Sequence, residues 1–141
     1  MIKLYNIFKD IILEEQRLIT EGISRDEIIE AIDSFYRYRI LYQGENEAEP
    51  NIRFVDFYVL GISKAGNEVV RVFQGGGYSS RRKFGQWKLL RVDRILRIEK
   101  TGQHVGYKPI SSYGSGTPPF NEYGDKSMTN VIYIKKNFKS N

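Results

Sequence analysis

The stretch IRFVDFYVLGISKAGNEVVRVF, residues 52–73, decides the fold. Its first nine residues are apolar on both alternating faces, with Phe54 on one face and Val55 on the other. A strand of this composition is central in a sheet or heavily covered. Gly66 and Asn67 tolerate positive φ and stand just before a second apolar run, so the stretch predicts a β-hairpin whose first strand is central or heavily covered.

Shorter runs of β-type composition lie on both sides of this hairpin and are separated by turn residues. They span residues 38–43, 87–98 and 130–135. Several short strands around a central hairpin are typical of a small antiparallel β-barrel of the SH3-like or Sm-like kind. We therefore expect a barrel whose core spans residues 38–105.

The first 37 residues have a helical pattern instead. Apolar residues recur at three- and four-residue steps across residues 2–19 and predict an amphipathic helix that ends at Gly22. Ser24 and Glu27 then form a capping box, which predicts the start of a second helix.

Together these patterns predict an α+β fold in a single domain. A helical arm of two helices occupies residues 1–37, and the barrel follows it. Residues 106–141 form an irregular arm rich in glycine, proline and tyrosine, with a final strand.

Length and composition restrict the class of protein. A chain of 141 residues is long enough for one core. The absence of cysteine excludes disulfides and thiolate metal sites and is typical of a reducing compartment, so we expect the protein in the cytoplasm. Charges at Lys3, Lys9 and Asp10 interrupt the first apolar segment, which predicts that it does not span a membrane.

The net charge of +5 is unevenly distributed along the chain. Residues 1–37 carry five basic and eight acidic side chains, whereas residues 81–100 alone carry eight basic ones, interspersed with Trp87 and an apolar run. Positive charge beside aromatic surface suits a partner with phosphates and bases, so the segment predicts binding of a nucleotide or single-stranded nucleic acid. The alternative is a merely solvated charged surface.

Three segments resemble the WYL-domain family across residues 38–100. They are RFVDFYVLG at 53–61, GNEVVR at 66–71 and WKLLRVDRI at 87–95. The most specific element is residues 91–95, which is similar to the family's closing Arg-Leu-Asp-Arg-Ile-like segment. Residues 69–71, Val-Val-Arg, stand where the family has its Trp-Tyr-Leu, and Phe57 stands where a proline is usual.

The resemblance implies a non-enzymatic sensor fold whose basic pocket binds nucleotides or single-stranded nucleic acid. Such domains are often fused to helix-turn-helix regulators, or occur alone in phages and defence systems. The candidate binding residues in this chain are Arg71, Tyr78, Arg81, Arg82, Trp87, Lys88, Arg91 and Arg94.

Each main candidate also has a structural interpretation. The Arg91 and Arg94 guanidinium groups match phosphate geometry, but Asp93 can pair with one of them. By strand alternation Arg71 lies on an apolar face, so its charge must reach solvent, meet an acid such as Asp56, or line a pocket. Of these three possibilities we favour the pocket. Trp87 can stack on a base, but its apolar neighbours favour burial.

No residue is assigned to catalysis, to a metal or to a cofactor. The run Gly75–Gly77 lacks the Gly-Lys-Ser/Thr ending of a phosphate-binding loop, and His104 has no second ligand at metal spacing. We expect a regulatory or accessory binding protein that is not an enzyme. The alternative is a structural or adaptor protein of a larger assembly such as a phage particle. In that case the first helix and the tyrosine-rich segment 106–124 contact other subunits or further copies of this chain.

Overall fold

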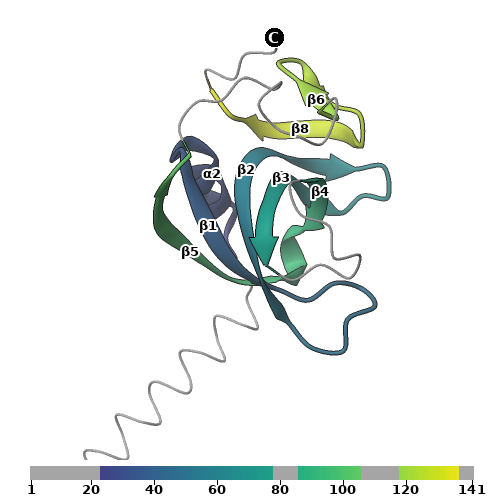
Figure 1. The fold of residues 1–141 in the computed structure, drawn as a ribbon. Coiled ribbons are helices and arrows are strands. Elements are labelled where there is room, and N and C mark those ends of the chain that lie inside the picture. The colour runs from purple at the N-terminus through teal and green to yellow at the C-terminus, as the bar shows by residue number, and fades with distance from the viewer. Residues whose placement is uncertain (1–22, 78–85, 106–117, 137–141) are drawn as a thin grey trace, which may run out of the picture.

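The structure, a computed structural model, describes residues 23–77, 86–105 and 118–136. Most of these residues are in antiparallel strands, and one α-helix precedes them (Figure 1). The elements are α2 (Arg25–Asp33), β1 (Tyr36–Tyr42), β2 (Asn51–Ser63), β3 (Glu68–Gly77), β4 (Gln86–Arg91), the 3-10 turn η1 (Val92–Arg94), β5 (Ile95–His104), β6 (Phe120–Asn121), β7 (Gly124–Asp125) and β8 (Met128–Ile134).

The predicted capping box at the start of α2 is confirmed. The Ser24 hydroxyl accepts a hydrogen bond from the Glu27 amide at 3.2 Å, and the Glu27 carboxylate accepts one from the Ser24 amide at 3.4 Å. Ile28, Ala31 and Ile32 form the buried stripe of the helix. The other expected helix, in residues 2–19, lies outside the described residues.

Strand β2 is the centre of the sheet, as predicted. It pairs with β3 along one edge, and the turn between them holds Gly66 at φ 87°. Its other edge is shared by two strands: β1 pairs with residues 51–55 and β8 pairs with residues 59–63. Figure 1 shows β8 and the β6–β7 hairpin at one end of the molecule and the β1–β2 loop at the other.

The expectation of a closed barrel is wrong. The strand order is β4-β3-β2-β1-β5, and β4 and β5 at its two ends do not pair within the described residues, so the sheet stays open. The chain passes from β4 to β5 through η1, and α2 supplies apolar side chains to the core of the open sheet. The final strand expected at residues 130–135 is present as β8. The irregular arm expected before it is wrong for residues 120–125, which form the β6–β7 hairpin.

The sheet has a core on each face. On the face that α2 covers, the helix packs with strand residues that include Val55, Phe57 and Leu60. On the other face, which we call the hairpin face, Tyr58 and Phe73 pack with residues of the C-terminal segment. Because both faces are covered, β2 is apolar on both, which is the pattern that the sequence shows.

Candidate binding site for an anionic group

Three of the candidate residues, Tyr78, Arg81 and Arg82, lie outside the described residues. The other five separate into two groups at different places in the structure. Arg71 and Trp87 belong to the hairpin face, whereas Lys88, Arg91 and Arg94 lie near the β1–β2 loop.

Arg71 forms a buried ion pair on the hairpin face. Its side chain is on the same face as Phe73, as strand alternation predicts, and the residue is 6% exposed. Its Nε and Nη2 donate to the two carboxylate oxygens of Asp125 at 2.7 and 2.9 Å. The structure therefore shows Arg71 meeting an acid, Asp125 in β7, and not the pocket lining that the sequence favoured.

Trp87 packs among aromatic rings on the same face. Its ring centroid lies 5.1 Å from that of Tyr58, 5.2 Å from that of Phe73 and 5.0 Å from that of Phe120, each in edge-on geometry. Trp87 is thus a partly buried packing residue, as its apolar sequence neighbours favour.

A hollow of about 290 Å³ lies between the β1–β2 loop and β4. Its lining includes Tyr42 at the end of β1, the loop from Gly44 to Glu47, Arg53 in β2 and Lys88 in β4. Ligand pockets in proteins have volumes of about 300–1,000 Å³, so this hollow has room for one small group.

Two basic residues, Arg53 and Lys88, line this hollow, and Arg91 and Arg94 lie close to Tyr42. The Arg53 guanidinium lies 4.8 Å from the Tyr42 ring centroid, and the Arg91 amide donates to the Tyr42 hydroxyl at 3.2 Å. Burial raises the pKa of Tyr42, while the Arg91 amide and the charges of Arg53 and Arg94 act in the opposite direction. Lys88 lines the same hollow.

Arg91 and Arg94 each donate to an acceptor of their own. Arg91 donates to both Asp93 oxygens at 3.0 and 2.6 Å, and this pairing raises the pKa of Arg91. Arg94 donates to the Gln43 carbonyl at 3.5 Å. The Arg91–Asp93 pair is half-exposed and therefore weak, so it leaves Arg91 available for exchange with another anion.

Arg53 is the residue of this site that sequence reasoning missed. It is 7% exposed, its Nη1 donates to Gln74 at 3.2 Å, and its Nη2 donates to Glu47 at 2.5 Å. Its buried Nε has no hydrogen-bond acceptor among the described residues. Strand alternation could have identified Arg53. It alternates with Val55 and Phe57 on β2, so its charge lies on an inward, apolar face, as was argued for Arg71.

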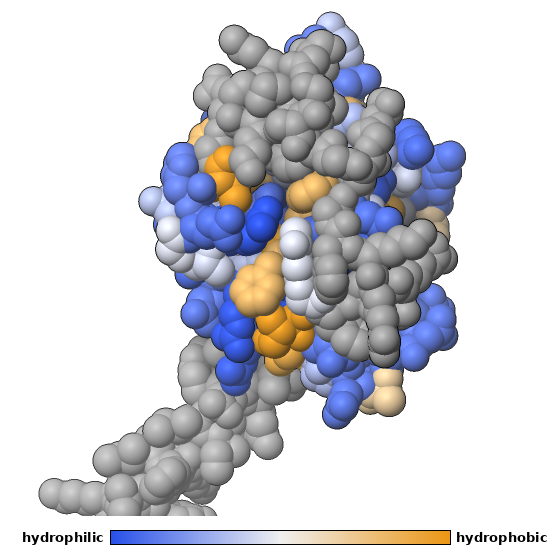
Figure 2. Space-filling model, in the orientation of Figure 1, coloured by the Kyte–Doolittle hydropathy of each residue, from blue (hydrophilic) through white to orange (hydrophobic). Residues whose placement is uncertain are grey.

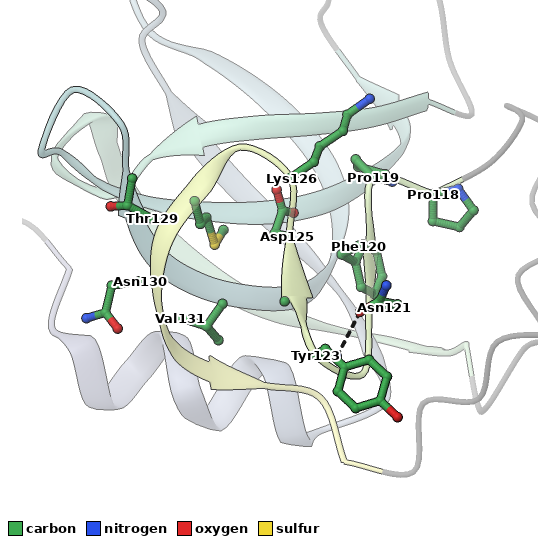
Figure 3. Close-up of a pocket in the computed structure, with 12 residues that line it drawn as sticks. Pro118, Pro119, Phe120, Asn121, Tyr123, Asp125, Lys126, Thr129, Asn130 and Val131 are labelled. Atoms are coloured by element: carbon green, nitrogen blue, oxygen red, sulfur yellow. Dashed lines mark hydrogen bonds between the residues drawn. The ribbon is translucent and has the colours of Figure 1, made fainter.

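A second hollow is larger but less suited to an anion. It has a volume of about 680 Å³ and lies between the β6–β7 hairpin and β8, as Figure 3 shows. Of the described residues that line it, Asp125 and Lys126 carry charge, and Asp125 already pairs with Arg71. Tyr123, at the turn of the hairpin, is 88% exposed.

Apolar surface does not single out another site. The face seen in Figure 2 is mainly hydrophilic, with a short band of apolar side chains near its middle. Within the described ranges, no group of His, Asp and Glu side chains could hold a metal ion. His104 packs edge-on against Tyr36 with centroids 5.1 Å apart. In the same part of the chain, no helix is long and apolar enough to cross a membrane.

Lys135, just after β8, is a buried cation away from the hollow. Its Nζ donates to the Ile32 carbonyl in the last turn of α2 at 2.7 Å and lies 4.4 Å from the centroid of the Phe35 ring. Burial lowers the pKa of Lys135 to about 8, although Asp56 and Asp33 act in the opposite direction.

The free energy of unfolding should therefore rise with pH through the titration of Lys135. Between about pH 8 and 10.5 the unfolded chain binds a proton that the folded chain does not, so higher pH favours the folded state. Relative to the Lys135→Met variant, the wild type should gain stability on the order of 2–3 kcal/mol from pH 7 to 10. Urea denaturation of both proteins at several pH values measures this, and parallel pH profiles would contradict it.

Comparison with known proteins gives no relative from which a role could be transferred. No family model, no curated protein and no solved structure matches this chain. The resemblance to the WYL-domain family therefore stays a prediction.

Proposed function

We propose that this protein is a non-enzymatic binding module that holds a nucleotide or single-stranded nucleic acid by its phosphate in the hollow between the β1–β2 loop and β4. The observation that carries the proposal is a hollow lined by Arg53 and Lys88, with Arg91 and Arg94 close to Tyr42 in its lining. Arg53 comes from β2, Lys88 and Arg91 from β4, and Arg94 from η1.

The donor set in the hollow suits phosphate. Guanidinium groups present a planar fork that matches two phosphate oxygens, and an ammonium adds a point charge. Arg53 is already desolvated and fixed by Gln74 and the Tyr42 ring, so little conformational entropy is lost when an anion binds it. The role is that of a regulatory or accessory protein, as the WYL-domain resemblance implies.

Replacement of Lys88 by alanine should weaken binding of 5′-phosphorylated single-stranded oligonucleotides about tenfold at low salt, because one contact with the terminal phosphate is lost. Arg94→Ala should have a similar effect. Lys64→Ala is the matched control: it removes the same charge from the exposed turn between β2 and β3 and should leave affinity nearly unchanged.

Filter binding at 50 and 200 mM salt, roughly the range over which phosphate contacts lose most affinity, measures these effects. Circular dichroism of each variant checks that the fold is intact. Equal losses in Lys64→Ala and Lys88→Ala would mean that net charge, not this hollow, attracts the nucleic acid. No binding by the wild type at low salt would refute the function.

The alternative of a structural or adaptor protein depends on residues 2–19 and on the segment 106–124. The structure does not describe residues 1–22 and 106–117, so that alternative stays a prediction.

A further inference from the structure

The side chain of Glu47, in the β1–β2 loop, lines the same hollow as Arg53 and Lys88. Its Oε1 accepts from Arg53 Nη2 at 2.5 Å, and its Oε2 accepts from the Gly44 amide at 3.1 Å. Its side chain is 9% exposed, an unusual degree of burial for a glutamate at a loop.

The conformation of the β1–β2 loop brings the Glu47 carboxylate back to the loop's own backbone. The Glu47 amide donates to the Gly44 carbonyl at 3.1 Å and closes a tight turn, and Gln43 Nε2 holds the Glu47 carbonyl at 3.0 Å. A Cβ at Gly44 would lie 2.8 Å from Glu47 Oε1, so glycine permits the close approach of the carboxylate.

The groups that hold the Glu47 carboxylate are the groups that bind phosphate in proteins: a backbone amide of a turn and a guanidinium. Beside them, the buried Nε of Arg53 has no acceptor within the described residues. A carboxylate has two oxygens, whereas a phosphate monoester has three terminal ones and a larger charge. A phosphate in this place can therefore use a donor that Glu47 leaves unused.

From these contacts we infer that a terminal phosphate of the ligand binds in the position of the Glu47 carboxylate, which we call the phosphate seat, and that the carboxylate competes with it. The ligand is then a phosphomonoester such as a nucleoside 5′-monophosphate. This inference rests on the proposed function and names the ligand class of the same site. The seat is buried and the hollow is about 290 Å³, so a chain end fits it and the continuous diester backbone of an oligonucleotide does not.

The competition has a measurable consequence. A site that is open for a fraction of the time binds its ligand with an affinity reduced by that fraction. Glu47→Gln keeps the shape of the side chain and removes its charge, so it should tighten phosphomonoester binding about tenfold if the wild-type seat is open about one tenth of the time. Glu47→Asp keeps the charge on a side chain one methylene shorter, so it should also tighten binding.

The matched control is Glu49→Gln. Glu49 is exposed on the same loop, and its backbone carbonyl accepts a hydrogen bond from the Asn51 side chain. This variant changes the net charge as Glu47→Gln does and should bind within about twofold of the wild type, since the seat is unaltered.

Isothermal titration calorimetry of the full chain tests the inference with three probes: a pool of the four ribonucleoside 5′-monophosphates, the matching nucleosides, and a tetranucleotide pool with hydroxyl groups at both ends. Tighter binding of the monophosphates by both Glu47 variants, with Glu49→Gln unchanged, is the expected result. Thermal melting of each variant confirms that it is folded.

Two results would overturn the inference and leave the proposed function standing. One is an equal gain in Glu47→Gln and Glu49→Gln, which would mean that only net charge matters. The other is tighter binding of the tetranucleotide pool than of the monophosphates by Glu47→Gln. If no probe binds any folded variant at low salt, the proposed function falls, and the inference falls with it.

Discussion

Replacement of Asp125 by alanine should lower the free energy of unfolding by about 3–5 kcal/mol. Asp125 is 6% exposed and is the carboxylate partner of Arg71, which is equally buried. Without Asp125 the Arg71 guanidinium stays in the interior with no carboxylate to balance it, and the desolvation of that charge is no longer compensated. Chemical denaturation followed by circular dichroism measures the loss.

The same replacement should loosen the β6–β7 hairpin. Asp125 lies in β7 and ties the hairpin to β3, and Phe120 in β6 packs against Trp87. Trp87 is the only tryptophan of the chain, so its fluorescence should move to longer wavelength as the ring becomes hydrated. Unchanged fluorescence in a destabilised Asp125→Ala protein would show that the ion pair does not hold the hairpin.

Two further variants separate the charge from the packing. The double replacement Arg71→Met with Asp125→Leu removes both charges and keeps side-chain volume, so it should cost much less than Asp125→Ala alone. Glu122→Ala, in the exposed turn of the same hairpin, should change stability by no more than about 0.5 kcal/mol. If the double variant is as unstable as the single one, the loss comes from packing and not from the unpaired charge.

The local parts of this fold could be predicted from the sequence because their signals are local. The Ser24–Glu27 capping box involves residues three apart, and the turn at Gly66 joins strands that are adjacent in the chain. The central place of β2 follows from apolar residues on both of its faces. In each case the residues that determine the structure lie within a few positions of one another.

The non-local parts could not be predicted by the same means. β8 pairs with the same edge of β2 as β1 does, although β8 is about 70 residues from β2 in sequence. No pattern within β2 or β8 encodes this pairing. The barrel was expected because short strands around a hairpin suit closure, yet closure depends on whether β4 and β5 meet. Their composition does not decide this, and the helix α2 contributes side chains to the core instead.

The candidate binding residues also divide into those with a local sequence signal and those whose partners are distant in sequence. The basic segment that contains Lys88, Arg91 and Arg94 was found from its positive charge, its aromatic and apolar neighbours and its resemblance to a known family, all of which are local signals. The partner of Arg71 was not, because Asp125 is 54 residues away. Arg53 was within reach, since an arginine on the inward face of a central strand requires a partner or a ligand, and its pairing with Glu47 spans only six residues.

Replacement of Phe57 by alanine should destabilise the protein by about 3–5 kcal/mol. Phe57 is 1% exposed and packs edge-on against Tyr38, with ring centroids 5.5 Å apart, in the core on the face that α2 covers. The cavity left by the ring lies beneath both the helix and the centre of β2, where the pairing of Phe57 with Val72 of β3 limits how far the backbone can move to fill it.

Phe54→Ala is the matched control for this prediction. It makes the same chemical change on the same strand, but Phe54 is half-exposed, so a smaller transfer free energy is lost and water can enter the space. The ratio of the two losses, measured by urea denaturation, therefore reports how rigid the centre of β2 is. Equal losses would mean that the sheet collapses around the missing Phe57 ring, and the open sheet would then owe little to close packing beneath α2.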